Sequence, residues 1–169
     1  MLVLGLDPGT AITGYGLVRE VEGELAVVEY GAITTPAHLA QAERLLQIYQ
    51  ELSALISRHI PVAVAVEKLF FSRNVRTAMA VGQARGVALL AAAHAGLPVY
   101  EYTPLEVKQA IAGYGGATKE QVQQMVQLLL GLEEVPQPDD AADAIAVAVC
   151  HLHSARLVDL LGKQGQSVS

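Results

Sequence analysis

The sequence has little of several features that would assign a protein to a special class. Its 169 residues include one cysteine, Cys150, so no disulfide can form within the chain, and a cytoplasmic location is expected. Charged residues make up 17% and hydrophobic residues 52%, which excludes an intrinsically disordered chain. The length suits one domain with a buried core, since domains of about 100–200 residues are the common case.

Long apolar segments are also missing. The longest hydrophobic stretches are interrupted by Gly, Gln, Arg or His before they reach the roughly 20 residues that a membrane-spanning helix needs. The N-terminal segment has no basic region and reaches an aspartate at position 7. We therefore expect neither a membrane span nor a secretory signal peptide.

Positive charge is scarce. Lys and Arg number 11 against 17 Asp and Glu, which gives a formal net charge of −6. DNA-binding proteins are usually basic, so this balance counts against a nucleic-acid partner. Binding depends on local patches rather than on the sum, however, and a site that holds divalent cations adds negative charge of its own until the metal binds.

The hydrophobic pattern predicts an α/β protein. Short apolar or alternating runs predict strands at Leu2–Asp7, Gly14–Arg19, Leu25–Thr34, Pro61–Glu67 and Val99–Tyr102. Helical spacing and capping residues predict helices at Leu39–His59 and Val75–Ala95, two that begin after Thr103 and Thr118, and one from Asp139 or Asp140 to about Leu161. This order indicates a mixed sheet between layers of helices. We expect one domain over residues 1–161 and a flexible tail over 162–169.

Two of the predicted strands end on a carboxylate. Asp7 follows the apolar run 2–6, and Glu67 follows the apolar run 62–66. Sites in open α/β sheets form outside the carboxyl ends of parallel strands. If the two strands are neighbours, Asp7 and Glu67 meet at one edge of the sheet.

A second pair of carboxylates lies near the end of the chain. Asp140 and Asp143 are three residues apart, which places them one turn apart on one face of the predicted helix. Four carboxylates that converge repel one another, and a divalent cation relieves that repulsion. Oxygen-only ligands suit Mg²⁺ or Mn²⁺ rather than Zn²⁺, and two such ions about 4 Å apart promote phosphodiester hydrolysis.

Each acid also has a structural interpretation. Asp7 precedes a Pro-Gly turn, Asp139 and Asp140 both suit a helix cap, and Glu67 has Lys68 beside it for a surface ion pair. Asp143 is harder to explain in this way. It lies in an otherwise apolar helical stretch, where a lone buried charge is costly.

Together these motifs resemble the RuvC family of Holliday junction resolvases in order and spacing over nearly the whole chain. The matching segments are Leu4-Gly5-Leu6-Asp7-Pro8-Gly9-Thr10, Thr13-Gly14-Tyr15-Gly16, Val66-Glu67-Lys68-Leu69-Phe70, Gly82-Gln83-Ala84-Arg85-Gly86, Val107-Lys108-Gln109 and Asp140-Ala141-Ala142-Asp143-Ala144. The opening motif alone is weak, and the full set is specific. The resemblance implies a ribonuclease H-like α/β fold, whose mixed five-stranded sheet has one antiparallel strand and helices on both faces.

The resemblance also implies an activity. A homodimer would nick two opposed strands of a four-way DNA junction with Mg²⁺ or Mn²⁺, two ions in each site, during DNA recombination and repair. It would meet the RuvA–RuvB branch-migration complex. The family's catalytic and metal-binding acids match Asp7, Glu67, Asp140 and Asp143.

Further residues match DNA contacts of the family. Phe70 matches a phenylalanine near the junction centre, where a ring stacks on an unpaired base, although the sequence leaves open whether Phe70 or Phe71 is exposed. Lys108 and Lys119 match basic groups near the scissile phosphate, although solvated surface lysines are common at such positions.

Three arginines that follow Glu67 offer the local positive charge that the net charge hides. Arg73, Arg76 and Arg85 lie in one loop-helix unit, and arginine forks onto phosphate. A solvated helix face is the alternative for all three, and an internal ion pair for Arg85.

The helix over Val75–Ala95 has small residues at four-residue spacing, Ala78, Gly82 and Gly86. They would allow the helix of a second copy to approach closely, or the helix could pack on its own sheet. A junction has approximate two-fold symmetry, so two cuts need two copies in an isologous dimer.

Three other functions fit part of the pattern. The Asp7-Pro8-Gly9-Thr10 turn also resembles the first phosphate loop of the actin, Hsp70 and sugar-kinase superfamily, which needs a second such domain. A junction-binding module without catalysis, and an RNA-processing nuclease of the same fold, would carry similar motifs. A panel of duplex, hybrid and four-way substrates would separate them.

Overall fold

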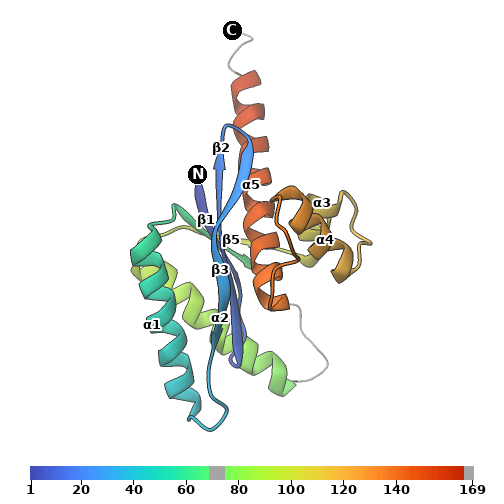
Figure 1. The fold of residues 1–169 in the computed structure, drawn as a ribbon. Helices are drawn as coiled ribbons and strands as arrows, with labels where there is room; N and C mark the ends of the chain where they lie inside the picture. Colours follow the sequence, from blue (N-terminus) through green and yellow to red (C-terminus); the bar gives the residue numbers. More distant parts are fainter. Residues whose placement is uncertain (69–74, 166–169) are drawn as a thin grey trace.

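A five-stranded mixed sheet forms the centre of the molecule (Figure 1). The structure is a computed structural model that describes residues 1–68 and 75–165. The sheet has the order β3-β2-β1-β4-β5, and only β2 runs against the other strands. The predicted mixed sheet is thus confirmed. Its strands are β1 (Leu2–Asp7), β2 (Ile12–Val21), β3 (Glu24–Thr34), β4 (Ala63–Glu67) and β5 (Val99–Tyr102).

Helices cover both faces of the sheet, as predicted. The helices form two layers, one on each face (Figure 1), and each layer packs on a core of its own. The first layer consists of α1 (Gln41–His59) and α2 (Val75–His94); the second consists of α3 (Pro104–Ala112), α4 (Lys119–Leu129) and α5 (Asp139–Gly165). The last helix continues to Gly165, so the expected helix end near Leu161 was wrong.

Local sequence signals set the ends of several elements. The hairpin turn between β2 and β3 uses positive φ at Glu22 (53°) and Gly23 (93°). Both predicted capping boxes form. Thr103 accepts a hydrogen bond from the backbone N–H of Glu106 at 3.1 Å, and Thr118 likewise from Gln121 at 3.2 Å. These caps determine where α3 and α4 begin.

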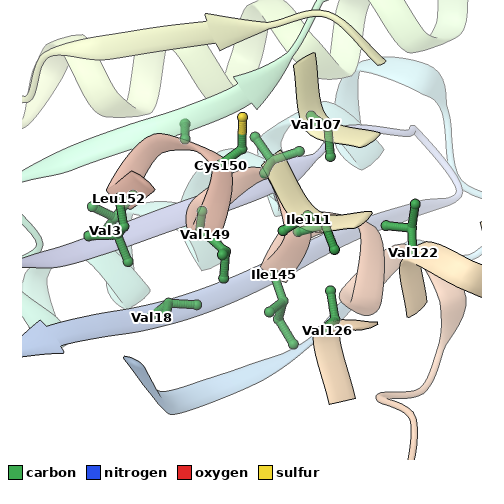
Figure 2. Close-up of a cluster of buried hydrophobic side chains, with 14 of the residues drawn as sticks. Val3, Val18, Val107, Ile111, Val122, Val126, Ile145, Val149, Cys150 and Leu152 are labelled. Carbon is green, nitrogen blue, oxygen red and sulfur yellow. The ribbon is translucent and has the colours of Figure 1, made fainter. Parts of the chain in front are cut away.

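The alternation of side chains along β1 gives each face of the sheet its own core. Val3 belongs to the core beneath α5, whereas Leu4 and Leu6 belong to the core beneath α1 and α2. Figure 2 shows the first of these cores, in which Ile145 and Val149 of α5 lie beside the sheet. Burial of apolar side chains on both faces is the main force that holds the layers together.

The apolar character of α5 is explained by this core. The segment Asp139–Val158 is long and apolar enough to cross a membrane by composition alone, and 61% of its apolar window is buried inside the molecule. A core helix passes the same test, so the segment gives little support to a membrane span.

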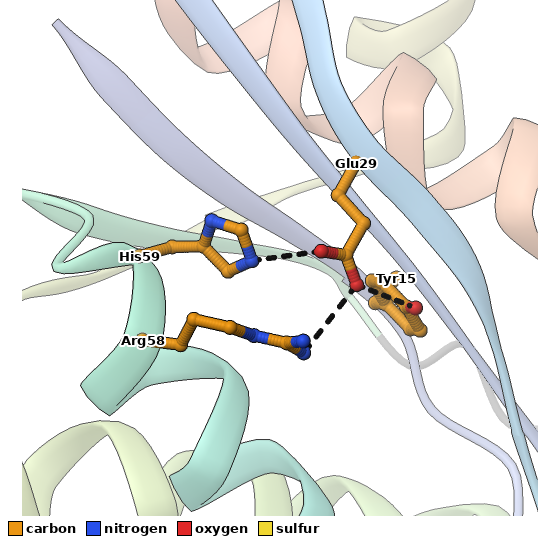
Figure 3. A network of polar contacts seen from close by, with 4 residues as sticks. All are labelled: Tyr15, Glu29, Arg58 and His59. Carbon is orange, nitrogen blue, oxygen red and sulfur yellow. Dashed lines mark hydrogen bonds and ion pairs between the residues drawn. The ribbon is translucent and has the colours of Figure 1, made fainter.

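Polar contacts connect the C-terminal end of α1 to the sheet (Figure 3). Glu29 of β3 accepts a hydrogen bond from the Tyr15 hydroxyl at 3.1 Å and lies 2.9 Å from Nε2 of His59. Arg58 approaches the same carboxylate at 3.5 Å. The network therefore joins three elements on the face that α5 does not cover.

Candidate active site

Strand register brings the first two predicted acids together. β1 and β4 are parallel neighbours, and Leu6 is paired with Val66, so Asp7 and Glu67 end adjacent strands at the same edge. Odd-numbered residues of both strands face α5, as the burial of Val3 and Ala65 in that core shows. Both carboxylates therefore lie on the α5 side of the sheet.

Glycines let the first turns of α5 lie directly on the strands. A Cβ built at Gly14, which is paired with Asp7, would overlap the backbone carbonyl of Asp140. A Cβ at Gly5 would overlap the carbonyl of Ala144 in the same way. Since no side chain separates helix from sheet here, Asp140 and Asp143 come close to Asp7, and their charges act on it.

Two lysines complete a cleft beside the acids. The cleft has a volume of about 180 Å³ and is lined by Glu67, Pro104, Val107, Lys108, Lys119 and Asp143, among others. Lys108 comes from α3 and Lys119 is the first residue of α4, directly after its Thr118 cap. The cleft therefore holds two of the predicted acids, Glu67 and Asp143, together with both predicted lysines, and Asp7 lines a second pocket that shares Glu67 and Pro104 with it.

Lys119 forms ion pairs with two carboxylates of α5. Its Nζ lies 2.8 Å from Asp143 and 3.6 Å from Asp139. Burial alone lowers the pKa of Lys119, but the contacts with Asp143 and Asp139 outweigh it, and the pKa is raised. Asp139 thus lies in the first turn of α5 and faces Lys119, instead of capping the helix as expected.

The electrostatics of the cluster are dominated by burial and mutual repulsion. Burial, followed by the carboxylates of Asp143, Asp140 and Glu67, raises the pKa of Asp7 from 3.8 to about 7. A carboxyl group with this pKa is only partly ionised at neutral pH. Such strongly perturbed groups are typical of functional sites.

The same two causes act on the neighbouring acids. Burial and then Asp143 raise the pKa of Glu67, while Lys108 and Lys119 oppose the shift. Burial also raises the pKa of Asp143, although the hydrogen bond from Lys119 opposes it. The described ion pairs include none between Glu67 and Lys68, so this structural interpretation of Glu67 finds no support.

The chemistry of the cluster fits a divalent cation. The four acids offer carboxylate oxygens, the donors that Mg²⁺ and Mn²⁺ prefer, in a place where uncompensated negative charge is costly. Within residues 1–68 and 75–165, no three His, Cys, Asp or Glu side chains already form a set of metal ligands. Lys119 supplies part of the compensating charge instead, so a metal would compete with its ammonium group for Asp143.

The remaining predicted DNA contacts fall in different places. Phe70 and Arg73 lie outside the described residues, as does Phe71. Arg76 lies in the first turn of α2, and its side chain is outside the described part. Arg85 forms an ion pair with Glu101, which is the internal pairing that the sequence left as an alternative.

His151 shares a helix with the acids but has a structural role. It is buried and stacks on Tyr100 with ring centroids 4.3 Å apart, and its Nδ1 lies 2.7 Å from the Tyr102 hydroxyl. Burial lowers its pKa. His151 is therefore a packed, hydrogen-bonded residue of the core.

Sequence reasoning missed two features around the cleft. It did not link Lys119 to Asp139, because that contact depends on how α4 and α5 pack. It also overlooked Tyr114, an exposed aromatic in the glycine-rich loop before α4. The Gly113-Tyr114-Gly115-Gly116 pattern was the available signal.

Comparison with known proteins places the chain among nucleases. A family model described as crossover junction endodeoxyribonuclease RuvC matches residues 3–151. The crossover junction endodeoxyribonuclease RuvC of Desulfitobacterium hafniense is 60% identical over 162 residues, which cover 96% of this chain and 98% of the relative. That of Heliobacterium modesticaldum is 61% identical over 154 residues, which cover 91% of this chain and 95% of the relative.

Solved structures agree with this result. The chain matches T. thermophilus RuvC in complex with a Holliday junction substrate with a TM-score of 0.89 and 41% identity, over 93% of this chain and 96% of that one. The yeast mitochondrial Holliday junction resolvase matches with a TM-score of 0.69 at 13% identity, over 98% of this chain and 86% of that one. At this low identity the match is evidence for a shared fold only. The expected ribonuclease H-like fold is confirmed.

Proposed function

The chain belongs to the RuvC family of crossover junction endodeoxyribonucleases, and we propose that it resolves Holliday junctions by a pair of symmetric nicks in DNA recombination and repair. The observation that supports this most is the cluster of Asp7, Glu67, Asp140 and Asp143, whose charges act on one another, next to a cleft that Lys108 and Lys119 line with Glu67 and Asp143. Such a combination of acids and cations suits hydrolysis of a phosphodiester and has no evident purpose in the core of the fold.

The four acids are the proposed ligands of divalent cations. Members of the family depend on a divalent metal, and the finer proposal is two Mg²⁺ or Mn²⁺ ions per site. When bound, such ions activate a water molecule and stabilise the leaving oxygen. The carboxyl of Asp7 must give up its proton to act as a ligand, which its raised pKa makes sensitive to pH near 7.

We propose that two lysine side chains bind the phosphate of the DNA. Lys108 and Lys119 line the cleft on the side of Asp143. An ammonium group binds a phosphate oxygen as a compact point charge, so both would hold the scissile phosphate against the acids. Phe70, Arg73 and Arg76 are proposed to contact the junction, as the family resemblance implies.

A homodimer is the proposed assembly. Helix α2 exposes an apolar stripe that includes Met79 (62% exposed) and Leu90 (59% exposed). A Cβ built at Gly82 or Gly86 meets nothing within 4 Å among the described residues, so these glycines do not serve packing on the chain's own sheet. Small residues between exposed apolar ones suit a close helix–helix contact with a second copy.

Cleavage of defined substrates tests the function. We expect cleavage of a synthetic four-way DNA junction with Mg²⁺ or Mn²⁺, none with a chelator, and far weaker cleavage of duplex DNA or an RNA–DNA hybrid. The variant Asp7→Asn should bind the junction but not cut it, whereas Glu24→Gln, an exposed acid of the distant hairpin, should cut normally. Binding without cleavage by the wild-type protein would favour a non-catalytic junction-binding module.

Cleavage of the RNA–DNA hybrid would favour an RNA-processing nuclease. An assay of ATP hydrolysis tests the ATPase interpretation, which is excluded if the protein does not hydrolyse ATP. A cytoplasmic location and an encounter with the RuvA–RuvB complex are proposed from the resemblance alone.

A further inference from the structure

The loop between α3 and α4 returns along α3 to the edge of the cleft. Gly113 ends α3 in a left-handed conformation, with φ of 84°. A Cβ built at Gly115 would overlap the side chain of Leu105, which lies in the first turn of α3 beside the cleft residue Pro104. The loop then ends at Thr118, the cap that precedes Lys119. Residues 113–117 therefore lie against α3 and lead directly to Lys119, one of the residues that line the cleft.

Tyr114 is held in this loop by a hydrogen bond and yet remains exposed. Its hydroxyl donates a hydrogen bond to Oε1 of Gln121 at 2.7 Å, and the same oxygen accepts the backbone N–H of Thr118 at 2.9 Å. Gly116 leaves space for the ring, whose atoms lie 3.6 Å from a Cβ built there. In spite of these contacts the residue is 50% exposed.

The two helices that flank Tyr114 carry both apolar surface and positive charge. Leu105, which packs against the loop, is 55% exposed. Lys108 and Lys119 lie on the same helices, α3 and α4, and face the cleft. A strand of DNA offers the complementary chemistry, because its phosphates alternate with flat apolar bases. Aromatic rings next to a cationic groove are the usual platform for unstacked bases.

From this arrangement we propose that Tyr114 stacks on a nucleobase of the cleaved strand, next to the phosphate that Lys108 and Lys119 hold. The inference rests on the proposed function and adds a base contact on the α3–α4 side of the cleft. The ring is fixed before DNA arrives, so little conformational entropy is lost when a base stacks on it.

Fluorescence of substituted junctions tests the contact directly. Four-way junctions carry 2-aminopurine at single positions on either side of the cut site, and the wild-type protein is added with a chelator so that no strand is cut. We expect quenching or enhancement of fluorescence at one position, retained in Tyr114→Phe and Tyr114→Trp and lost in Tyr114→Ala. Leu128→Ala, which removes an exposed apolar side chain elsewhere on α4, is the matched control.

Binding measurements separate stacking from a role in loop structure. Loss of one stacked base weakens binding roughly tenfold, so Tyr114→Ala should raise the junction Kd by about that factor. Tyr114→Phe, which lacks only the bond to Gln121, should stay within about twofold of the wild type. Equal binding by Tyr114→Ala, or equal damage by Tyr114→Phe, overturns the proposal.

The outcomes also separate this inference from the proposed function. If the wild-type protein cleaves junctions while Tyr114→Ala shows unchanged binding and fluorescence, the inference fails and the proposed function stands. If the wild-type protein neither binds nor cleaves a four-way junction, both fail.

Discussion

Asp7 is the most perturbed acid of the cleft, and its protonation links stability to pH. Its pKa in the folded protein, about 7, lies above the ordinary value of 3.8 because of burial and three neighbouring carboxylates. Between these two pH values the folded chain retains a proton that the unfolded chain has lost. The free energy of unfolding of the metal-free protein should therefore fall as pH rises from about 4 to about 7.

Replacement of Asp7 tests this linkage. Since one pKa unit corresponds to about 1.4 kcal/mol, the shift from 3.8 to about 7 sets an upper limit of about 4 kcal/mol. The amide of Asp7→Asn is itself costly to bury, so we expect this variant to stabilise the metal-free protein at pH 8 by about 2 kcal/mol and to flatten the pH dependence. Denaturant unfolding at pH 5 and pH 8 with a chelator measures the effect, and Glu24→Gln is the control. A variant that is less stable than the wild type at pH 8 would contradict the assignment of a costly buried charge.

The contribution of Lys119 to the stability of the fold should be largest when no metal is bound to the acids. Removal of its ion pairs by Lys119→Gln leaves Asp143 and Asp139 without their partner, at a cost of about 1 kcal/mol for a pair that is partly exposed. Added Mg²⁺ or Mn²⁺ should reduce this cost, because a bound cation takes over the compensation.

Unfolding curves with and without the cation measure this difference. Lys108→Gln serves as the control in the same cleft, and we expect a smaller loss of stability for it. The same loss for Lys119→Gln under both conditions would mean that ammonium and metal do not compete for Asp143.

At the scale of elements, the contact between α5 and the sheet determines the geometry of the acids. The helix reaches the strands only because Gly5 and Gly14 lack side chains. Any Cβ at Gly14 must push the start of α5 away from Asp7 or distort β2. The backbone of Asp140 cannot yield as a flexible side chain would, so the cost is that of overpacking a rigid core.

The variant Gly14→Ala should show this cost in both stability and cleavage. We expect a loss of about 1–3 kcal/mol in the free energy of unfolding, together with a large loss of cleavage, because the α5 acids move away from Asp7. Gly116→Ala is a suitable control, since a Cβ there makes only ordinary contacts at 3.6 Å. Equal stability of the two variants would refute the close approach of helix and sheet.

The elements were predictable where local chemistry determines them. Capping boxes located the starts of α3 and α4, and the apolar runs before Asp7 and Glu67 located two strands. Strand ends that depend on pairing were missed: β2 begins at Ile12 rather than Gly14, because its ladder with β3 extends to the Ile12–Thr34 pair.

The candidate site was likewise predictable only where local sequence determines it. Parallel strands that end on acids predicted the meeting of Asp7 and Glu67, and helical spacing predicted the pair on α5. The partners of the cations could not be predicted, because they depend on distances between elements that are remote in sequence. The contacts of Lys119 with Asp139 and of Arg85 with Glu101 are of this kind.

At the scale of the whole molecule, the exposed stripe of α2 determines the expected assembly. Gly86→Leu adds a large side chain where nothing lies within 4 Å in the described part of the chain. In an isolated chain this change would be harmless or mildly stabilising, because glycine is a poor helix former by about 1 kcal/mol. In a dimer that packs through α2, it should separate the protomers.

Sedimentation and cleavage distinguish these outcomes. We expect Gly86→Leu to be folded but largely monomeric at concentrations where the wild type is dimeric, and to lose paired cutting. Gln124→Leu, which adds the same side chain to an exposed position of α4, should remain dimeric. A dimeric Gly86→Leu variant would exclude α2 as the interface.

Helix α5 carries Asp140 and Asp143 on its first turns and supplies Ile145 and Val149 to the core that Figure 2 shows. The acids and these core residues belong to one continuous helix, so the acids are attached to one of the most deeply buried parts of the chain. Amide protons of its buried middle, residues 144–152, should exchange with solvent only when the entire domain opens. The backbone that carries Asp140 and Asp143 is then fixed to the most stable part of the fold, and adjustment to an incoming junction falls to the loops and lysines beside it.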